Sequence, residues 1–308
     1  MKSICIVFIE ILENDSIYFL SLLVGDLILC LQIQKLLVIS NSARLLSIRI
    51  VSLKIINKTL VNQKNNTILF SFVEKFQLNR FLFLHCFTWK PQKYLNFSFS
   101  VSDFAWLCLV KFACKPAQEF FFSPWSFGYR ANFSVFMLQR LLFLNLNIKF
   151  LGFQRRLFLV YIKGPFKVSK FNVFFRKLII PKCFKVSIFK FLNFGLNFNF
   201  SNNIFALDDF SSFISNVLLH GLEKKLEVIR FGSYFLFLLS PLHNELVLFY
   251  CFSYFIFCLG LKFYYMDLKI YSSLFGFDFL GWHFKFYFNQ GLLCVPSFDV
   301  NISIHLYK

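Results

Sequence analysis

The sequence predicts an α+β fold in which helical and strand signals are mixed along the chain. Residues 31–55 carry apolar side chains at helical spacing, with basic side chains between them. Residues 228–239 form two apolar runs around Gly232 and Ser233, a pattern typical of a β-hairpin with a two-residue turn. The sequence shows no internal repeat and no linker that would divide the chain cleanly. These observations favour a layered α+β arrangement.

The N-terminal part of the chain is predicted to be mainly helical. Residues 31–55 predict a pair of basic amphipathic helices, the second capped at Asn41-Ser42. The polar residues 56–68 predict a loop. Residues 101–122 predict a further helix, which the Ser-Pro-Trp turn at 123–125 closes.

The C-terminal part is predicted to mix strands and helices. Residues 157–162 are a short apolar run that predicts a strand. Residues 213–227 predict a helix that leads into the hairpin at 228–239. Residues 246–258 predict a buried helix because they are uniformly apolar, and residues 274–286 predict a pair of strands.

The composition indicates a strong codon bias. The chain is 57% hydrophobic and contains 50 Phe among its 308 residues, far from average usage. Phe, Lys, Asn, Ile and Leu share A/T-rich codons, and all five are abundant here. We therefore rely on motif spacing more than on propensities. The bias predicts synthesis inside a plastid, with a mitochondrion as the alternative.

The charge distribution predicts a polyanionic partner. The formal net charge is +18, and residues 120–207, called the acid-free stretch below, contain no Asp or Glu. A field of one sign over such a length favours RNA, because each neutralised phosphate releases counterions. The alternative, codon drift that places Lys on a solvated face, stays open. The basic residues of the stretch are Arg130, Arg140, Lys149, Arg155, Arg156, Lys163, Lys167, Lys170, Arg176, Lys177, Lys182, Lys185 and Lys190.

Neither metal nor cofactor binding is predicted. The nine cysteines include no C-x-x-C pair, and none is spaced with a histidine as a zinc ligand would be. Membrane insertion is not predicted either, since the uncharged run 246–261 is shorter than the ~20 residues that a spanning helix needs. An integral membrane protein of an organelle remains the alternative from a different class.

Short motifs occur in a fixed order between residues 31 and 300. They are Ala43-Arg44-Leu45-Leu46, Ala113-Cys114-Lys115-Pro116, Ser126-Phe127-Gly128-Tyr129-Arg130, Asn216 with Gly221-Leu222-Glu223, Ile229-Arg230-Phe231, and Gly276-Phe277-Asp278-Phe279-Leu280-Gly281. In this order they resemble the fingers and palm of group II intron reverse transcriptases, or maturases. The resemblance implies a reverse-transcriptase-like α+β scaffold whose N-terminal helices help to grip RNA.

The sequence departs from this family at the positions of the metal ligands. The palm of these enzymes holds two metal ions with clustered carboxylates. The first carboxylate position is occupied by Tyr161, the next acid is replaced by Lys167, and the hairpin pair by Ser233 and Tyr234. The resemblance therefore implies that the protein is not an enzyme and has neither catalytic nor metal-binding residues. We expect Tyr161 and Ser233–Tyr234 to lie together on neighbouring strands.

The resemblance also predicts a domain organisation. Residues 1–30 form an apolar N-terminal segment, residues 31–150 a fingers-like region with basic helices, residues 151–300 a degenerate palm, and residues 301–308 a tail. The helical thumb, or maturase domain, is expected to be missing. Degenerate, thumbless relatives of this family occur in euglenoid plastids.

These inferences predict a non-catalytic RNA-binding protein that assists plastid intron splicing or RNA folding. The expected partners are an intron or ribosomal transcript and a protein that supplies the thumb. A structural protein associated with a ribosome or a transcript is the alternative within the same class. The residues predicted to bind RNA are Arg44, Arg49, Arg130, Arg155, Arg156, Lys163 and Lys167.

Overall fold

The chain combines helices with β-sheets, which confirms the predicted α+β class. It divides into two compact units, the first made of Met1–Phe122 and Pro165–Leu218, the second of Ser123–Gly164 and Leu219–Lys308. The boundary predicted at residues 150–151 therefore lies inside the second unit. The computed structural model describes residues 26–61, 71–90, 101–130, 133–146, 152–163, 167–168, 171–193, 207–223, 228–241, 243–262, 265–288 and 290–297.

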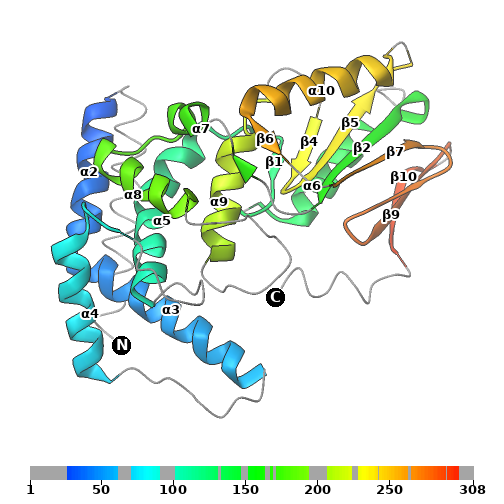
Figure 1. Cartoon of the computed structure of the whole chain (residues 1–308). Coiled ribbons are helices and arrows are strands. Elements are labelled where there is room, and N and C mark those ends of the chain that lie inside the picture. The colour runs from blue at the N-terminus through cyan, green and yellow to red at the C-terminus, as the bar shows by residue number, and fades with distance from the viewer. Residues whose placement is uncertain are drawn as a thin grey trace. The chain divides into compact units, whose positions relative to one another are not determined.

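The first unit is a helical assembly around α5 (Val101–Phe121), which packs against α2, α3 and α4. Trp106, Leu109 and Val110 of α5 are fully buried. Figure 1 shows α5 among its neighbours. The other elements of the unit are α2 (Leu27–Ile39), α3 (Asn41–Val61), α4 (Phe72–His85), the short strand β3 (Lys167–Val168), α7 (Phe171–Lys177), α8 (Lys182–Asn193) and α9 (Leu207–Leu219).

Side-chain caps define where these helices begin. The carboxylate of Asp26 accepts a hydrogen bond from the backbone N–H of Leu29 at 2.9 Å, which starts α2. Ser71 and Glu74 form a reciprocal capping box at the start of α4. The pair α2 and α3, separated only by Ser40, confirms the helix pair predicted from residues 31–55.

Two predicted boundaries are wrong. Helix α3 continues to Val61, whereas a loop was predicted from residue 56; residues 56–61 contain neither Gly nor Pro to stop the helix. Helix α9 ends at Leu219 and not at residue 227, because Gly221 adopts a φ of +112° and turns the chain.

The segment between α7 and α8 is fixed by two buried amides. Gln34 of α2 donates from Nε2 to the carbonyl of Ile179 at 3.0 Å. Gln118 of α5 donates to the carbonyl of Lys177 at 3.2 Å and accepts from the N–H of Ile179 at 3.3 Å. Trp106 stacks on Phe191 of α8, with ring centroids 5.3 Å apart. The basic helices α7 and α8 are therefore held on the core of the first unit.

The second unit is built on a five-stranded sheet with the order β1-β4-β5-β2-β7. Strand β1 pairs in parallel with β4, and the other neighbours are antiparallel. The β4–β5 pair and the long β2 confirm the hairpin predicted at 228–239 and the strand predicted at 157–162. The strands are β1 (Ser126–Phe127), β2 (Arg156–Lys163), β4 (Val228–Phe231), β5 (Tyr234–Leu239) and β7 (Tyr265–Ser272).

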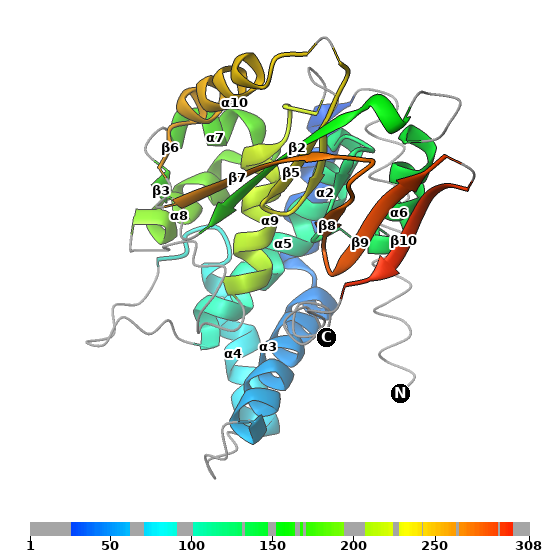
Figure 2. The same cartoon turned by 90° about the vertical axis from the view of Figure 1, so that its right-hand side faces the viewer.

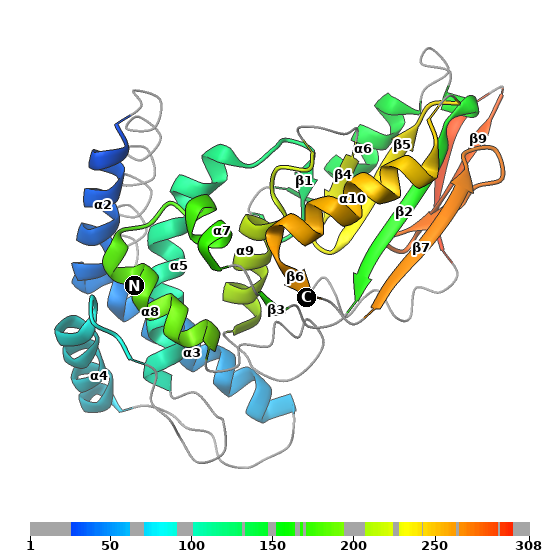
Figure 3. The same cartoon turned by 45° about the horizontal axis from the view of Figure 1, so that its top comes forward.

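The two faces of this sheet are covered differently. Helix α10 (Glu245–Leu259) lies along one face, where Phe252 packs against Phe235 and Phe237 of β5 (Figure 3). The other face packs against α6 (Val135–Asn145) and a three-stranded antiparallel sheet of β8 (Phe277–Phe279), β9 (Trp282–Tyr287) and β10 (Gly291–Pro296). Figure 2 shows α6 and this small sheet side by side. The short elements η2 (Gly152–Gln154) and β6 (Leu261–Lys262) complete the unit.

Helix α10 is not the buried helix that its composition predicts. Phe252, Ile256 and Leu259 are buried, but the apolar side chains on the opposite face are exposed, Leu246 to 76% and Phe257 to 69%. Sequence patterning missed this difference because both faces of the helix are apolar. The strand pair predicted at 274–286 is confirmed as β8 and β9.

No single helix in the described part of the chain is both long and apolar enough to cross a bilayer. Helices α2 and α3 reach that limit only as a pair, with a bend of 64° between them.

Candidate functional site

The tip of the β4–β5 hairpin is a two-residue turn whose first residue must be glycine. Phe231 and Tyr234 are paired across it, and Gly232 has a φ of +58°. A Cβ atom at Gly232 would lie 2.9 Å from Cε2 of Tyr129, so the tyrosine ring lies directly against the turn. Glycine at the first central position and a positive φ there are typical of a type II′ turn.

Tyr161 and Tyr234 meet beside this turn. They are register partners on β2 and β5, and their rings stack with centroids 4.2 Å apart and planes 12° apart. The carbonyl of Ser233 accepts a hydrogen bond from the N–H of Ile162 at 3.1 Å. The convergence of Tyr161 with Ser233–Tyr234, predicted from the sequence, is confirmed.

The third strand at this site supplies an ion pair. Asp267 of β7 is the register partner of Tyr161 on the side away from Tyr234. Its Oδ2 lies 3.7 Å from Nζ of Lys269, and both side chains are partly exposed, at 37% and 55%. Within the described part of the chain, no three His, Cys, Asp or Glu side chains gather closely enough to hold a metal ion.

A second turn is fastened to the hairpin tip. Gly128 follows β1 with a φ of +81°, and a Cβ there would lie 2.7 Å from the backbone N of Gly232. The N–H of Gly232 donates to the carbonyl of Phe127 at 3.2 Å. Tyr129 is half exposed and has a φ of +57°, unusual for a bulky residue. Such strained residues cluster at functional sites, which makes this corner a candidate binding surface.

Behind the hairpin lies a fully buried ion pair that the sequence analysis did not anticipate. Arg230 Nε lies 2.6 Å from Glu223 Oε1, and both side chains are completely buried. Glu223 also accepts from the N–H of Gly221 at 2.9 Å. Burial alone would raise the pKa of Glu223, but attraction to Arg230 and the hydrogen bonds lower it below its usual value. Both residues belong to motifs that the sequence analysis quoted, yet nothing in their spacing indicates that they pair.

Several residues predicted to bind RNA have structural partners. Arg44 is buried, donates to Oδ1 of Asn79 at 2.8 Å and also bonds the carbonyl of Ile39. It therefore joins α3 to α4 and is not a surface cation. Arg156 forms an ion pair with Glu245 at the start of α10.

Arg130 stabilises the turn after β1. Its Nη1 donates to the carbonyls of Ser123 and Ser126 at 2.8 and 2.7 Å, and its guanidinium lies 3.9 Å from the centroid of the Phe133 ring. The structure therefore gives Arg130 a structural role in this turn.

The remaining predicted residues are divided between the two units. Arg49 is exposed on α3 in the first unit, and Arg155 is partly buried in the second. Lys163 and Lys167 lie at the end of β2 and in β3, in different units, and their side chains are outside the described residues. The residues predicted to bind RNA are thus distributed over both units.

The acid-free stretch contributes further exposed cations that the predicted set omitted. Arg176 of α7 and Lys182 of α8 are exposed, and Lys190 of α8 is partly exposed. Lys185 differs from them because it donates to the carbonyl of Phe175 at 2.6 Å. Burial, with a contribution from Lys182, lowers the pKa of Lys185. The helical spacing of Lys182, Lys185 and Lys190 was the available signal in the sequence.

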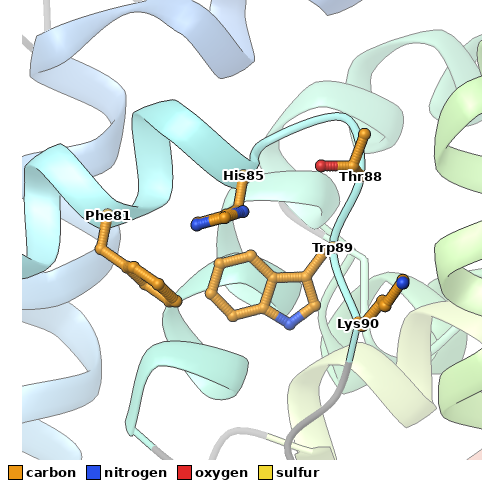
Figure 4. A pocket seen from close by; sticks show the side chains of 5 residues that line it. All are labelled: Phe81, His85, Thr88, Trp89 and Lys90. Atoms are coloured by element: carbon orange, nitrogen blue, oxygen red, sulfur yellow. The ribbon is translucent and has the colours of Figure 1, made fainter.

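A surface pocket of about 370 Å³ lies at the end of α4, lined by Phe81, His85, Thr88, Trp89 and Lys90 (Figure 4). The Trp89 ring is only 2% exposed, and its indole N–H donates to the carboxylate of Asp103 at 2.8 Å. No pattern in the sequence indicated this pocket.

The comparisons with known proteins identify two relatives. The chain is 37% identical over 283 residues to maturase-like protein 1 of Euglena longa and 36% identical over 284 residues to maturase-like protein 1 of Euglena gracilis. Each match covers 87% of this chain and 62% of the relative, so the chain spans less than two thirds of their length. No protein-family model matches the chain.

Proposed function

The chain is a homologue of the maturase-like proteins of Euglena over 87% of its length, and from this we propose that it binds RNA without catalysing polymerisation. The observation that carries the proposal is the stack of Tyr161 on Tyr234 beside Ser233. The resemblance to reverse transcriptases assigns these positions to metal-binding carboxylates. Two phenol rings and a hydroxyl cannot hold a pair of hard divalent ions, which require clustered oxygen anions.

RNA is the partner that the charges support best. The formal net charge is +18, and the acid-free stretch supplies exposed cations such as Arg176 and Lys182. Binding to a polyanion releases counterions from each neutralised phosphate and needs no sequence-specific contact. We also propose that the fold consists of reverse-transcriptase-like fingers and palm.

Within this function, we assign the protein to intron splicing or RNA folding in a plastid, acting together with a protein that supplies a thumb. The maturase-like name of both relatives supports the intron assignment. The alternative is a structural protein on a ribosome or transcript that would use the same basic side chains. The resemblance to the ribosomal operon-associated proteins of euglenoid plastids does not favour it, because that name describes the position of a gene. Crosslinking in organelles followed by sequencing of the bound RNA separates the two: intron reads support the first, ribosomal reads the second.

A charge-matched comparison tests RNA binding directly. Replacing Arg176, Lys182 and Lys190 with Gln should flatten the salt dependence of affinity by about two units, since each phosphate contact on a single strand contributes ~0.7. The control protein carries the same loss of charge outside the acid-free stretch and outside the N-terminal helix pair, at Lys75, Arg80 and Lys90, which are exposed in the first unit as well. Equal slopes for the two folded variants would contradict the assignment of binding to the acid-free stretch.

A further inference from the structure

We propose that the Tyr161–Tyr234 stack binds one unpaired RNA base, preferentially guanine, an inference that rests on the RNA-binding function proposed above. The stack gives two parallel rings in van der Waals contact, with centroids 4.2 Å apart. Both tyrosines are only partly buried. Aromatic rings at a surface are stacking platforms for single-stranded nucleic acid because every base has a π-face.

The register of three strands determines which ring face is available. Tyr234, Tyr161 and Asp267 are successive partners across β5, β2 and β7, so their side chains lie on the same face of the sheet. The Tyr234 ring has two aromatic neighbours. It stacks on Tyr161, and the Phe279 ring meets it edge-on with centroids 6.1 Å apart. The other side of Tyr161 is bounded by Asp267, and this is where a base would stack.

The side chains around this position favour a base over a phosphate. The Asp267 carboxylate repels phosphate but accepts hydrogen bonds from N–H groups. It accepts none from the described residues, because Lys269 Nζ at 3.7 Å is beyond hydrogen-bond distance. Guanine presents an imino and an amino N–H on one edge, which suits the two oxygens of a carboxylate. Lys269, 55% exposed, would then meet a neighbouring phosphate.

The same set of groups cannot replace the missing metal site. It contains one carboxylate, already next to a lysine, and two rings. Stacking, in contrast, requires only aromatic rings. The two tyrosine rings are already stacked on each other, so they lose little conformational freedom when a base is added. The site of metal-dependent chemistry in the related enzymes would in this protein hold a base by contact alone.

The experiment uses the full chain and three labelled RNA strands of equal length: a guanine–uracil strand, a uracil strand and a strand without bases. Tyr161→Leu should weaken binding of both base-bearing strands about tenfold and leave binding of the abasic strand unchanged. Tyr161→Phe, which keeps the ring, should bind as the wild type does. Asp267→Asn should reduce the preference for the guanine–uracil strand only. Tyr250→Leu, at a 75% exposed position of α10, is the control and should change nothing.

The outcomes separate this inference from the proposed function. Wild-type affinity of a folded Tyr161→Leu protein for the base-bearing strands would overturn the base site while leaving RNA binding intact. So would equal affinity of the wild type for the abasic and base-bearing strands. If Tyr161→Leu does not fold, the Asp267→Asn variant provides the test. A preference for the guanine–uracil strand that is unchanged in Asp267→Asn would then overturn the proposal. Failure of the wild type to bind any strand would overturn both.

Discussion

At the scale of single residues, the hairpin tip is defined by two stacked tyrosine rings and the serine beside them. Tyr161 and Tyr234 occupy facing positions on neighbouring strands, and Ser233 contributes its carbonyl to the backbone bond with Ile162. These three side chains include no carboxylate, so the tip offers stacking and hydrogen bonding rather than the oxygen anions that divalent ions require.

The first prediction concerns catalysis. The purified chain should extend no primer with either Mg²⁺ or Mn²⁺, because the resemblance to reverse transcriptases assigns the metal-binding carboxylates to the positions of Tyr161, Ser233 and Tyr234. The measurement is template-dependent nucleotide incorporation, with heat-killed protein as the control. Incorporation above that control would refute the assignment of a non-catalytic role.

A pair of glycines tests how tightly the two turns are joined. Gly128→Ala should destabilise the protein by about 1–2 kcal/mol more than Gly221→Ala. Both glycines have a positive φ, +81° and +112°, but a Cβ at Gly128 would meet the backbone N of Gly232 at 2.7 Å, whereas a Cβ at Gly221 would have no atom within 4 Å. Urea denaturation of the two variants gives the comparison, and equal losses would show that the approach of the two turns can relax.

The buried ion pair makes a prediction for both mutation and pH. Glu223→Gln should cost ~3–5 kcal/mol of stability, because it leaves Arg230 buried without its counter-charge. Asp267→Asn, which removes the exposed partner of Lys269, should cost at most ~1 kcal/mol. Urea denaturation at neutral pH measures both.

The pH dependence follows from the same pair. The folded pKa of Glu223 is lowered from 4.5, so its contribution is complete above that value and is lost as pH falls through the folded pKa. Stability of the wild type should therefore decline below pH 4.5, and Glu223→Gln should flatten that decline. An identical acid profile for the two proteins would argue against the ion pair.

At the scale of elements, α10 has two apolar faces with different environments. One face, with Phe252 between Phe235 and Phe237, belongs to the core of the second unit. The opposite face exposes Leu246 and Phe257. Hydrophobic composition alone does not distinguish the two faces of α10. Truncating a side chain should, however, lower stability much more on the buried face than on the exposed one.

A matched pair of substitutions measures this difference. Phe252→Ala should cost ~3–5 kcal/mol, because it opens a cavity under a fully buried ring. Phe257→Ala, one turn and a half further along the same helix, should change stability by no more than ~0.5 kcal/mol, since its ring is 69% exposed. Thermal unfolding of both variants tests this. A large loss from Phe257→Ala would mean that this face is covered in solution.

At the scale of the whole molecule, the net charge governs association with RNA. Raising salt from about 50 to about 200 mM should weaken binding ~100-fold if about five phosphates are contacted, given ~0.7 units of slope for each. Fluorescence anisotropy with a labelled single strand measures the slope. Affinity that does not change with salt would mean that the charge of +18 is not used for binding RNA.

The sequence predicted those parts of the fold whose signals are local. The Gly232-Ser233 turn between two apolar runs specifies the hairpin, and the motif order indicated that Tyr161 would lie beside it. The Arg230–Glu223 pair was missed because it depends on tertiary packing that the spacing of the two residues does not encode. The exposure of α10 was missed because a chain that is 57% hydrophobic hides amphipathic patterning. The two discontinuous units follow from packing, which spacing does not encode.

The Tyr161–Tyr234 stack has a consequence for how this lineage can change. Codons for Asp and Tyr differ only in their first base, so a single G-to-T exchange converts one residue into the other, and an A/T-rich genome favours that direction. An Asp at position 161 alone would place a carboxylate against the π-face of Tyr234, at a separation that suits two rings. Each ring therefore disfavours an acid at the partner position, and we expect a single Tyr-to-Asp exchange at either position to destabilise the hairpin.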